Sequence, residues 1–239
     1  MVKCFATQEG TMRKLKMLML GATVALGGVG TALAQEDTAA PASGLGPAAA
    51  ARIFKSCVAT ATTTPSPIRG TPGTKMWCAV LNREGLTLLI QATDTGESPG
   101  PNLTTDAWRA SIEIAEAKAY TALSVSSNDF ALDSRTVGLL SRFDGGGSGK
   151  PGTDTGPAPL FGLGDTNPFR PGIGDPSLHP DDQTGSKHHG IVTFAGGQPV
   201  YNCSTHKLLG GVGVSGDGVD QDDAVAIGAV TGAKFCLHP

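Results

Sequence analysis

The segment Leu208–Ala226, with the sequence LLGGVGVSGDGVDQDDAVA, decides how the chain folds. It begins as an apolar run, passes through a glycine-rich turn and ends where an acidic helix begins. Glycine-rich turns between a strand and a helix occur in phosphate-binding loops and at the nucleophile of many hydrolases. Both chemistries make specific demands on the residues of the turn.

Neither chemistry fits these residues. A phosphate-binding loop would need a lysine followed by serine or threonine, and the segment contains no lysine. A nucleophile elbow needs glycine two residues after the serine, whereas Asp217 stands at that spacing from Ser215. The carboxylates of Asp217, Asp220, Asp222 and Asp223 complement the positive end of a helix dipole and would repel an anion. Their spacing also differs from that of a calcium loop, so any metal at this cluster stays unassigned.

The N-terminus has the pattern of a secretory signal peptide. Basic residues 12–16 precede the apolar residues 17–30, and Ala32-Leu33-Ala34 forms a cleavage site of small residues. The pattern predicts that residues 1–34 are removed and that the mature protein begins at Gln35. We therefore expect a periplasmic or secreted protein with no membrane insertion after cleavage; an uncleaved anchor is the alternative.

The charge balance bears on the class of partner. The whole chain has a formal net charge of −3, and residues 1–34 contain four basic residues and one acidic residue. Removing that net +3 leaves the mature chain at −6. Because nucleic acids and anionic membrane surfaces repel an acidic protein, the composition predicts no nucleic-acid partner.

Four cysteines remain in the mature chain: Cys57, Cys78, Cys203 and Cys236. An even number of cysteines in an oxidising compartment predicts two disulfides. Of the three pairings we favour Cys57–Cys78 and Cys203–Cys236, because each would join a helix to a strand of its own half. Zinc binding and c-type haem attachment are disfavoured, because no Cys-x-x-Cys spacing occurs.

Two stretches of low complexity divide the mature chain. Residues 35–47 are rich in alanine, proline, glycine and serine, which predicts a flexible leader before a domain at 48–239. Residues 141–190 contain 12 glycines and 7 prolines, with no repeat and no apolar face. A loop of this length inside a compact domain is either functional or disordered. We therefore treat about 142–190 as an insertion.

The remaining segments predict an α+β fold. Their periodicity places helices at 48–61, 107–124 and about 217–235, a short helical turn at 135–141, and strands at 76–81, 86–92, 191–194, 199–202 and 207–214. Asp106 is the expected N-cap of the central helix. Helices and strands do not alternate regularly, which argues against a parallel sheet. We expect a single domain with a central antiparallel sheet of about five strands flanked by helices.

Four segments match, in order, the pattern of one known family. The hairpin Leu81–Gly85 has the family's form, with Asn82 where aspartate is usual. The helix around Lys118 follows Ser-x-x-x-Ala-x-x-Lys-Ala-x-Thr-Ala, and Phe194–Pro199 follows a Pro-Gly-Gly-x-Pro turn with Ala195 in place of the first proline. The opening segment supplies Gly-x-Gly-Val-Ser-Gly and a later Gln-Asp. Together these segments resemble the haem-binding HbpS/GlcG family.

The resemblance implies an α+β domain with a central antiparallel sheet, commonly assembled into oligomers. It implies haem or iron binding in some exported members, whereas most members have no defined activity. It also gives the glycine-rich turn an architectural role, because glycine permits tight turns and close contact between a helix and a sheet. This chain departs from the pattern in its export signal, its cysteines and its long insertion.

The histidines are the candidate axial ligands for a haem iron. An imidazole nitrogen binds haem iron, and apolar side chains must cover the ring. The candidates are His179, His188, His189 and His206, of which His188 and His189 form the densest pair. The alternative is that these histidines are solvated loop residues, since ligand histidines normally have a second group that orients them.

Lys118 is the only lysine of the central helix. It could face an anionic group such as a haem propionate, or it could pack its stem on the core while its ammonium reaches water. An ion pair within the helix does not explain it, because neither Glu113 nor Glu116 lies three or four residues away.

These observations favour an exported, non-catalytic protein that binds haem or a related tetrapyrrole or iron ligand and forms a homo-oligomer. The alternative is an oligomeric interaction protein of the cell envelope, without a cofactor, whose insertion is a docking arm for another envelope protein. Catalysis lacks support, because no acid–base pair or nucleophile–base arrangement can be assembled from the sequence.

Overall fold

The computed structural model describes residues 44–141, 160 and 190–239. In these ranges it has the helices α1 (Pro47–Thr63), α2 (Ser111–Ser124), α3 (Ser134–Leu140) and α4 (Val219–Gly232), and the strands β1 (Trp77–Asn82), β2 (Thr87–Ala92), β3 (Gly197–Tyr201) and β4 (Leu208–Ser215). The strands form one antiparallel sheet in the order β2-β1-β4-β3. None of the described helices is long and apolar enough to cross a membrane.

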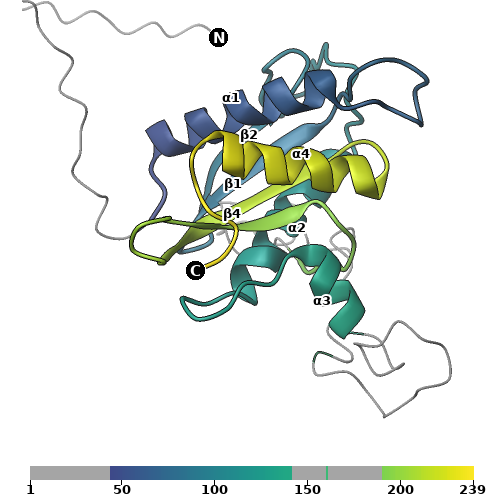
Figure 1. Ribbon diagram of the computed structural model, residues 1–239. Coiled ribbons are helices and arrows are strands. Elements are labelled where there is room, and N and C mark those ends of the chain that lie inside the picture. The colour runs from purple at the N-terminus through teal and green to yellow at the C-terminus, as the bar shows by residue number, and fades with distance from the viewer. Residues whose placement is uncertain (1–43, 142–159, 161–189) are drawn as a thin grey trace, which may run out of the picture. The chain divides into compact units, whose positions relative to one another are not determined.

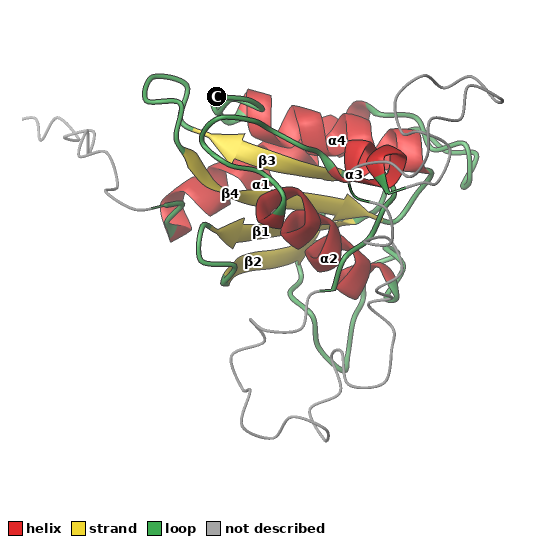
Figure 2. Cartoon of the chain, turned by 90° about the horizontal axis from the view of Figure 1, so that it is seen from below, coloured by secondary structure: helices red, strands yellow, loops and turns green. Residues whose placement is uncertain are grey.

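The sheet lies between two layers of helices. α1 and α4 run side by side over one face, and α2 with α3 lies on the other (Figures 1 and 2). β1 serves both layers because successive side chains of a strand point to opposite faces. Cys78 and Val80 pack in the core beneath α1 and α4, whereas Trp77, Ala79 and Leu81 pack in the core beneath α2.

β4 has a different character on each face. Its valines pack in the core beneath α1 and α4. Gly211 and Gly213 face the other way, directly under the backbone of α2. A Cβ atom at Gly213 would lie 1.8 Å from the carbonyl oxygen of Ala115, and one at Gly211 would lie 2.4 Å from that of Ala119. The helix backbone therefore rests on the strand backbone, which only residues without a side chain permit.

The α+β class with one antiparallel sheet is confirmed, but the described sheet has four strands and not five. Residues 191–194 do not form the expected strand because side chains of helices satisfy their backbone groups. The N–H of Val192 donates to Oγ1 of Thr121 at 2.9 Å. The carbonyl of Phe194 accepts from Oγ of Ser134 at 2.8 Å.

The central helix begins four residues later than expected. α2 starts at Ser111, and its N-cap is Ala110 rather than Asp106. The side chain of Asp106 forms an ion pair with Lys75. The backbone N–H of Asp106 donates to a carboxylate oxygen of Asp94 at 2.9 Å. These contacts hold residue 106 in the preceding loop, so it cannot cap the helix.

The structure contains one of the two disulfides expected from the sequence. Cys203 and Cys236 are bonded, and the disulfide links the turn after β3 to the C-terminal segment. Cys57 of α1 and Cys78 of β1 are buried free thiols, so the expected second disulfide is absent. Burial, together with a hydrogen bond to Cys78, raises the pKa of the Cys57 thiol. A buried protonated thiol is a poor nucleophile, which accounts for an unreacted pair.

We expect Gly213→Ala to destabilise the fold by about 3 kcal/mol, because the new methyl group must displace either α2 or β4. Gly100→Ala is the matched control, since the nearest atom to a Cβ there lies 3.9 Å away. Urea unfolding followed by circular dichroism measures both changes. Equal stability of the two variants would contradict the close packing of α2 on β4.

We expect the chain 35–239 to expose two reactive thiols when it is denatured without a reductant, and none when it is native. The native protein buries Cys57 and Cys78. Mass spectrometry after alkylation would identify the labelled residues. Labelling of neither residue in the denatured chain would show that Cys57 and Cys78 are joined by a disulfide.

Candidate functional site

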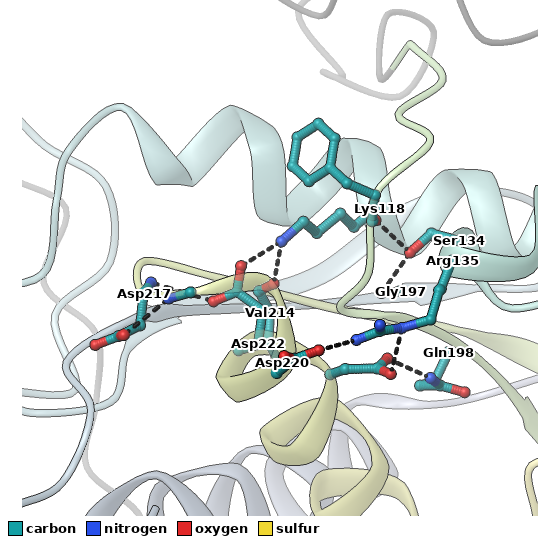
Figure 3. A network of polar contacts seen from close by, with 12 residues as sticks. Lys118, Ser134, Arg135, Gly197, Gln198, Val214, Asp217, Asp220 and Asp222 are labelled. Carbon is teal, nitrogen blue, oxygen red and sulfur yellow. Dashed lines mark hydrogen bonds and ion pairs between the residues drawn. The ribbon is translucent and has the colours of Figure 1, made fainter. Parts of the chain in front are cut away.

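The N-terminus of α4 meets α2, α3 and the ends of β3 and β4 in one polar network (Figure 3). The sequence predicted that aspartates would cap this helix. The N-cap is instead Gly218, without a side-chain cap. The carboxylate of Asp217 binds the hydroxyl of Ser66, and the backbone N–H of Asp217 donates to Oδ1 of Asp222 at 3.1 Å. Asp220 and Asp222 nevertheless lie in the first turn of α4, so the acidic cluster complements the helix dipole as expected and also makes tertiary contacts.

Lys118 forms the centre of the network. Its side chain is fully buried, and its Nζ lies 2.5 Å from Oδ2 of Asp222. The same nitrogen donates to the carbonyl of Val214 at 3.0 Å. It also lies 5.0 Å from the centre of the Phe194 ring, within the range of a cation–π interaction. An ammonium has three N–H donors, and these three partners surround it.

Burial dominates the electrostatics of this ion pair. Desolvation lowers the pKa of Lys118, and the carboxylates of Asp222 and Asp223 oppose that change. Desolvation also raises the pKa of Asp222, against the stabilising charge and hydrogen bond of Lys118. Each group thus depends on the other to remain charged away from water.

The position of Lys118 corrects the alternative in which its ammonium reaches water. Its ammonium does not reach solvent, because none of its side-chain surface is exposed. It donates to Asp222 and to the carbonyl of Val214, and the ring of Phe194 lies beside it. We conclude that Lys118 holds α2 and α4 together on the sheet. Its partner Asp222 lies 104 residues further along the chain, so looking for ion pairs within the helix of Lys118 could not identify it.

Arg135 of α3 makes the outer part of the network. Its Nη2 lies 2.7 Å from Oδ1 of Asp220, and its Nε lies 3.2 Å from Oδ2 of Asp223. Gln198 of β3 donates to the other oxygen of Asp223 at 2.9 Å. The hydrogen bond to Asp220 is the main cause that raises the pKa of Arg135. The pairs lie near the surface, so they orient α3 more than they stabilise the fold.

Two exposed apolar residues, called the apolar rim below, belong to the segments of the network: Leu139 follows Arg135 by one turn of α3, and the Phe194 ring lies 5.0 Å from Nζ of Lys118. Their side chains are 46% and 41% exposed. Ser134 fixes the backbone here, since its hydroxyl donates to the carbonyl of Phe194 and accepts from the N–H of Gly197, both at 2.8 Å. The rim therefore lies where the chain rejoins α2 and α3 after the insertion.

Of the predicted histidines, the structure describes only His206, and it does not lie near Lys118. His206 is exposed in the turn between β3 and β4, with a φ of 57°, at the end of that hairpin opposite to the network. His179, His188 and His189 lie outside the described residues. Within the described ranges, no group of three or more histidine, cysteine, aspartate or glutamate side chains is arranged to hold a metal ion.

In the described network, the ionisable side chains hold the fold together. Its ionisable groups Lys118, Arg135 and Asp222 are bonded to one another or to the backbone. The sequence singled out Lys118 and Asp222 separately but did not connect them. It gave no signal for Arg135, and it placed Phe194 in a turn of the family pattern without relating it to Lys118, because only the fold brings those segments together.

We expect Asp222→Ala to cost about 3–5 kcal/mol, because it leaves a buried ammonium without its counter-charge. The double variant Lys118→Met/Asp222→Ala should lose less than the sum of the single losses, because it removes both charges. Urea unfolding of wild type, both single variants and the double variant gives the coupling. Additive losses would contradict the ion pair.

The same variant predicts a pH dependence. In Asp222→Ala, desolvation lowers the pKa of Lys118 further below its ordinary value of 10.5, because the opposing carboxylate is gone. The unfolded chain then binds more protons than the native chain between the two pKa values, so stability rises with pH up to about 10.5. Unfolding curves at a series of alkaline pH values should rise more steeply for the variant than for wild type.

Solved structures with a related arrangement include Klebsiella pneumoniae protein ORFY, with 22% identity, a TM-score of 0.48, and coverage of 82% of this chain and 95% of that one. A PduOC–haem complex has 21% identity and a TM-score of 0.47, covering 82% of this chain and 99% of that one. A double mutant of Streptomyces reticuli HbpS has 20% identity and a TM-score of 0.41, covering 88% and 97%. Similarity at this level says nothing about ligands.

No curated protein is similar enough to this sequence to count as a match. The family model described as "Haem degrading protein HbpS-like" matches residues 45–231. The match begins just before α1 and ends one residue before the end of α4, so it spans the whole sheet and all four described helices. The chain therefore belongs to the HbpS-like family.

Proposed function

We propose that the mature chain is an exported protein that binds haem or a related tetrapyrrole without degrading it. The observation that carries the proposal is membership of the HbpS-like family over residues 45–231, since haem is the ligand that the family's description names. The signal-peptide pattern of residues 1–34 supports export.

The apolar rim supports a location for the ligand. A haem needs an axial ligand for its iron and apolar surface for its ring. His188 and His189 directly precede Gly190, where the described chain resumes, and Phe194 of the rim follows four residues later. In our proposal the histidine pair supplies the iron ligand, and Leu139 and Phe194 supply apolar surface.

The polar network supports binding rather than turnover. Haem degradation would require groups that move protons to and from a bound oxygen species. Lys118 and Asp222 are sequestered by each other at 2.5 Å, and Arg135 is engaged by Asp220 and Asp223. In the described part of the site, these groups are used to hold the helices in place.

Hemin titration tests the proposal. We expect the chain 35–239 to give a saturable shift of the Soret band, and His188→Ala/His189→Ala to weaken binding at least tenfold, because the axial ligand is lost. His206→Ala is the matched control, since this histidine lies at the opposite end of the β3–β4 hairpin. Unchanged affinity of the double variant would remove the pair as ligands.

Two further measurements distinguish the proposal from haem degradation and from an interaction protein without a cofactor. A Soret band that persists in the presence of oxygen and a reductant fits binding, whereas its steady loss with release of iron would show degradation. No Soret shift in wild type, together with a defined oligomer in solution, would favour an envelope interaction protein without a cofactor.

A further inference from the structure

An open groove lies on the other side of the sheet, between α1 and the C-terminal end of α4. Its volume is about 630 Å³. Figure 1 shows the two helices side by side on this face. They approach closely because Gly232 faces Ser56, where a Cβ atom would lie 2.0 Å from the serine Oγ. The volume falls within the range of about 300–1,000 Å³ that small-molecule sites occupy.

The groove is basic on both walls. Arg52 and Lys55 line it from α1, and Lys234 lines it from the segment after α4; none of its lining residues is acidic. None of these three cations has an ion-pair partner among the described residues. This concentration of positive charge stands out in a chain with a net charge of −3.

The side chain of Arg52 and the backbone of Lys234 have fixed positions. The guanidinium carbon of Arg52 lies 5.4 Å from the centre of the Phe235 ring, which holds the side chain by a cation–π interaction. Lys234 has a φ of 65°, and its N–H donates to the carbonyl of Thr231 at 3.0 Å. The Cys203–Cys236 disulfide begins two residues later and secures this segment. Groups fixed before binding lose little entropy when a ligand arrives.

Compensation of the helix dipole does not account for the whole cluster. A cation just beyond the last turn of α4 complements the negative end of that helix, which explains Lys234. Arg52 and Lys55 belong to α1, three residues apart on one face of the helix. Like charges at that spacing repel each other, so their own helix gains nothing from the pair.

We infer that this groove binds a small molecule that carries at least two anionic groups, either carboxylates or phosphates. The planar guanidinium of Arg52 fits two oxygens of such a group, and Lys55 and Lys234 supply point charges. An anion with two charged ends would contact both walls and relieve the repulsion within α1. The site is separate from the proposed haem site, which lies on the α2 side of the sheet.

Calorimetric titration of the chain 35–239 with citrate and with pyrophosphate tests this inference at constant ionic strength. We expect saturable binding of at least one of the two, and the stronger ligand shows whether the site takes carboxylates or phosphates. Lys55→Gln should weaken that binding at least tenfold, because the anion loses a direct charged partner. Arg109→Gln, which removes an exposed positive charge near the start of α2, should change it less than twofold.

A second pair of variants keeps the test independent of folding. Ala59→Glu places a carboxylate in the groove at an exposed position of α1, whereas Ala110→Glu adds the same charge at an exposed position before α2, outside the lining. We expect Ala59→Glu to abolish binding and Ala110→Glu to preserve it. The inference is overturned if wild type binds neither anion saturably, or if the control variants lose binding as much as the groove variants. Because no hemin is present, these outcomes leave the haem proposal untouched.

Discussion

The close contact between the backbones of α2 and β4 governs the arrangement of this domain. Gly211 and Gly213 leave the α2 face of the central strand without side chains, so the carbonyls of Ala115 and Ala119 can lie against it. At that separation, the lysine one turn along α2 reaches the end of β4. Its ammonium must then be buried at the end of this strand, where it needs a carboxylate.

Asp222 supplies this carboxylate and thereby fixes the position of α4 on the sheet. Lys118 binds Asp222 near the start of the helix, and Arg135 binds Asp220 and Asp223 on either side of Asp222 in the sequence. Two helices that lie on opposite faces of the sheet are thus joined at one end by charge. The same contacts set the position of α3 and of the exposed rim of Leu139 and Phe194, which borders the insertion.

The two faces of the sheet consequently offer different chemistry. On the α2 side, Lys118 and Arg135 are neutralised by neighbouring aspartates, and the apolar side chains of Leu139 and Phe194 are exposed. On the α1 and α4 side, three cations surround a groove without an acidic partner. An apolar tetrapyrrole and a small polyanion therefore suit opposite faces, and neither ligand competes with the other for charged groups.

The sequence by itself determined the class of fold and the family, because both depend on local patterns. Runs of strand-forming residues joined by a turn defined β1 and β2, and the glycines of Leu208–Ala226 indicated a strand that a helix approaches closely. It failed where tertiary contacts compete with local preference: residues 191–194 have strand-forming side chains, yet Thr121 and Ser134 take their hydrogen bonds. The same competition moved the start of α2 from Ala107 to Ser111.

Only the tertiary structure decided the roles of the charged residues. Lys118 and Asp222 are 104 positions apart, and Arg52 and Lys234 are separated by most of the domain. Whether a lysine is a ligand, a surface group or an internal ion pair depends on the dielectric and on the partners around its ammonium. Those surroundings exist only once distant segments pack, which is why the sequence could name the residues but not assign their partners.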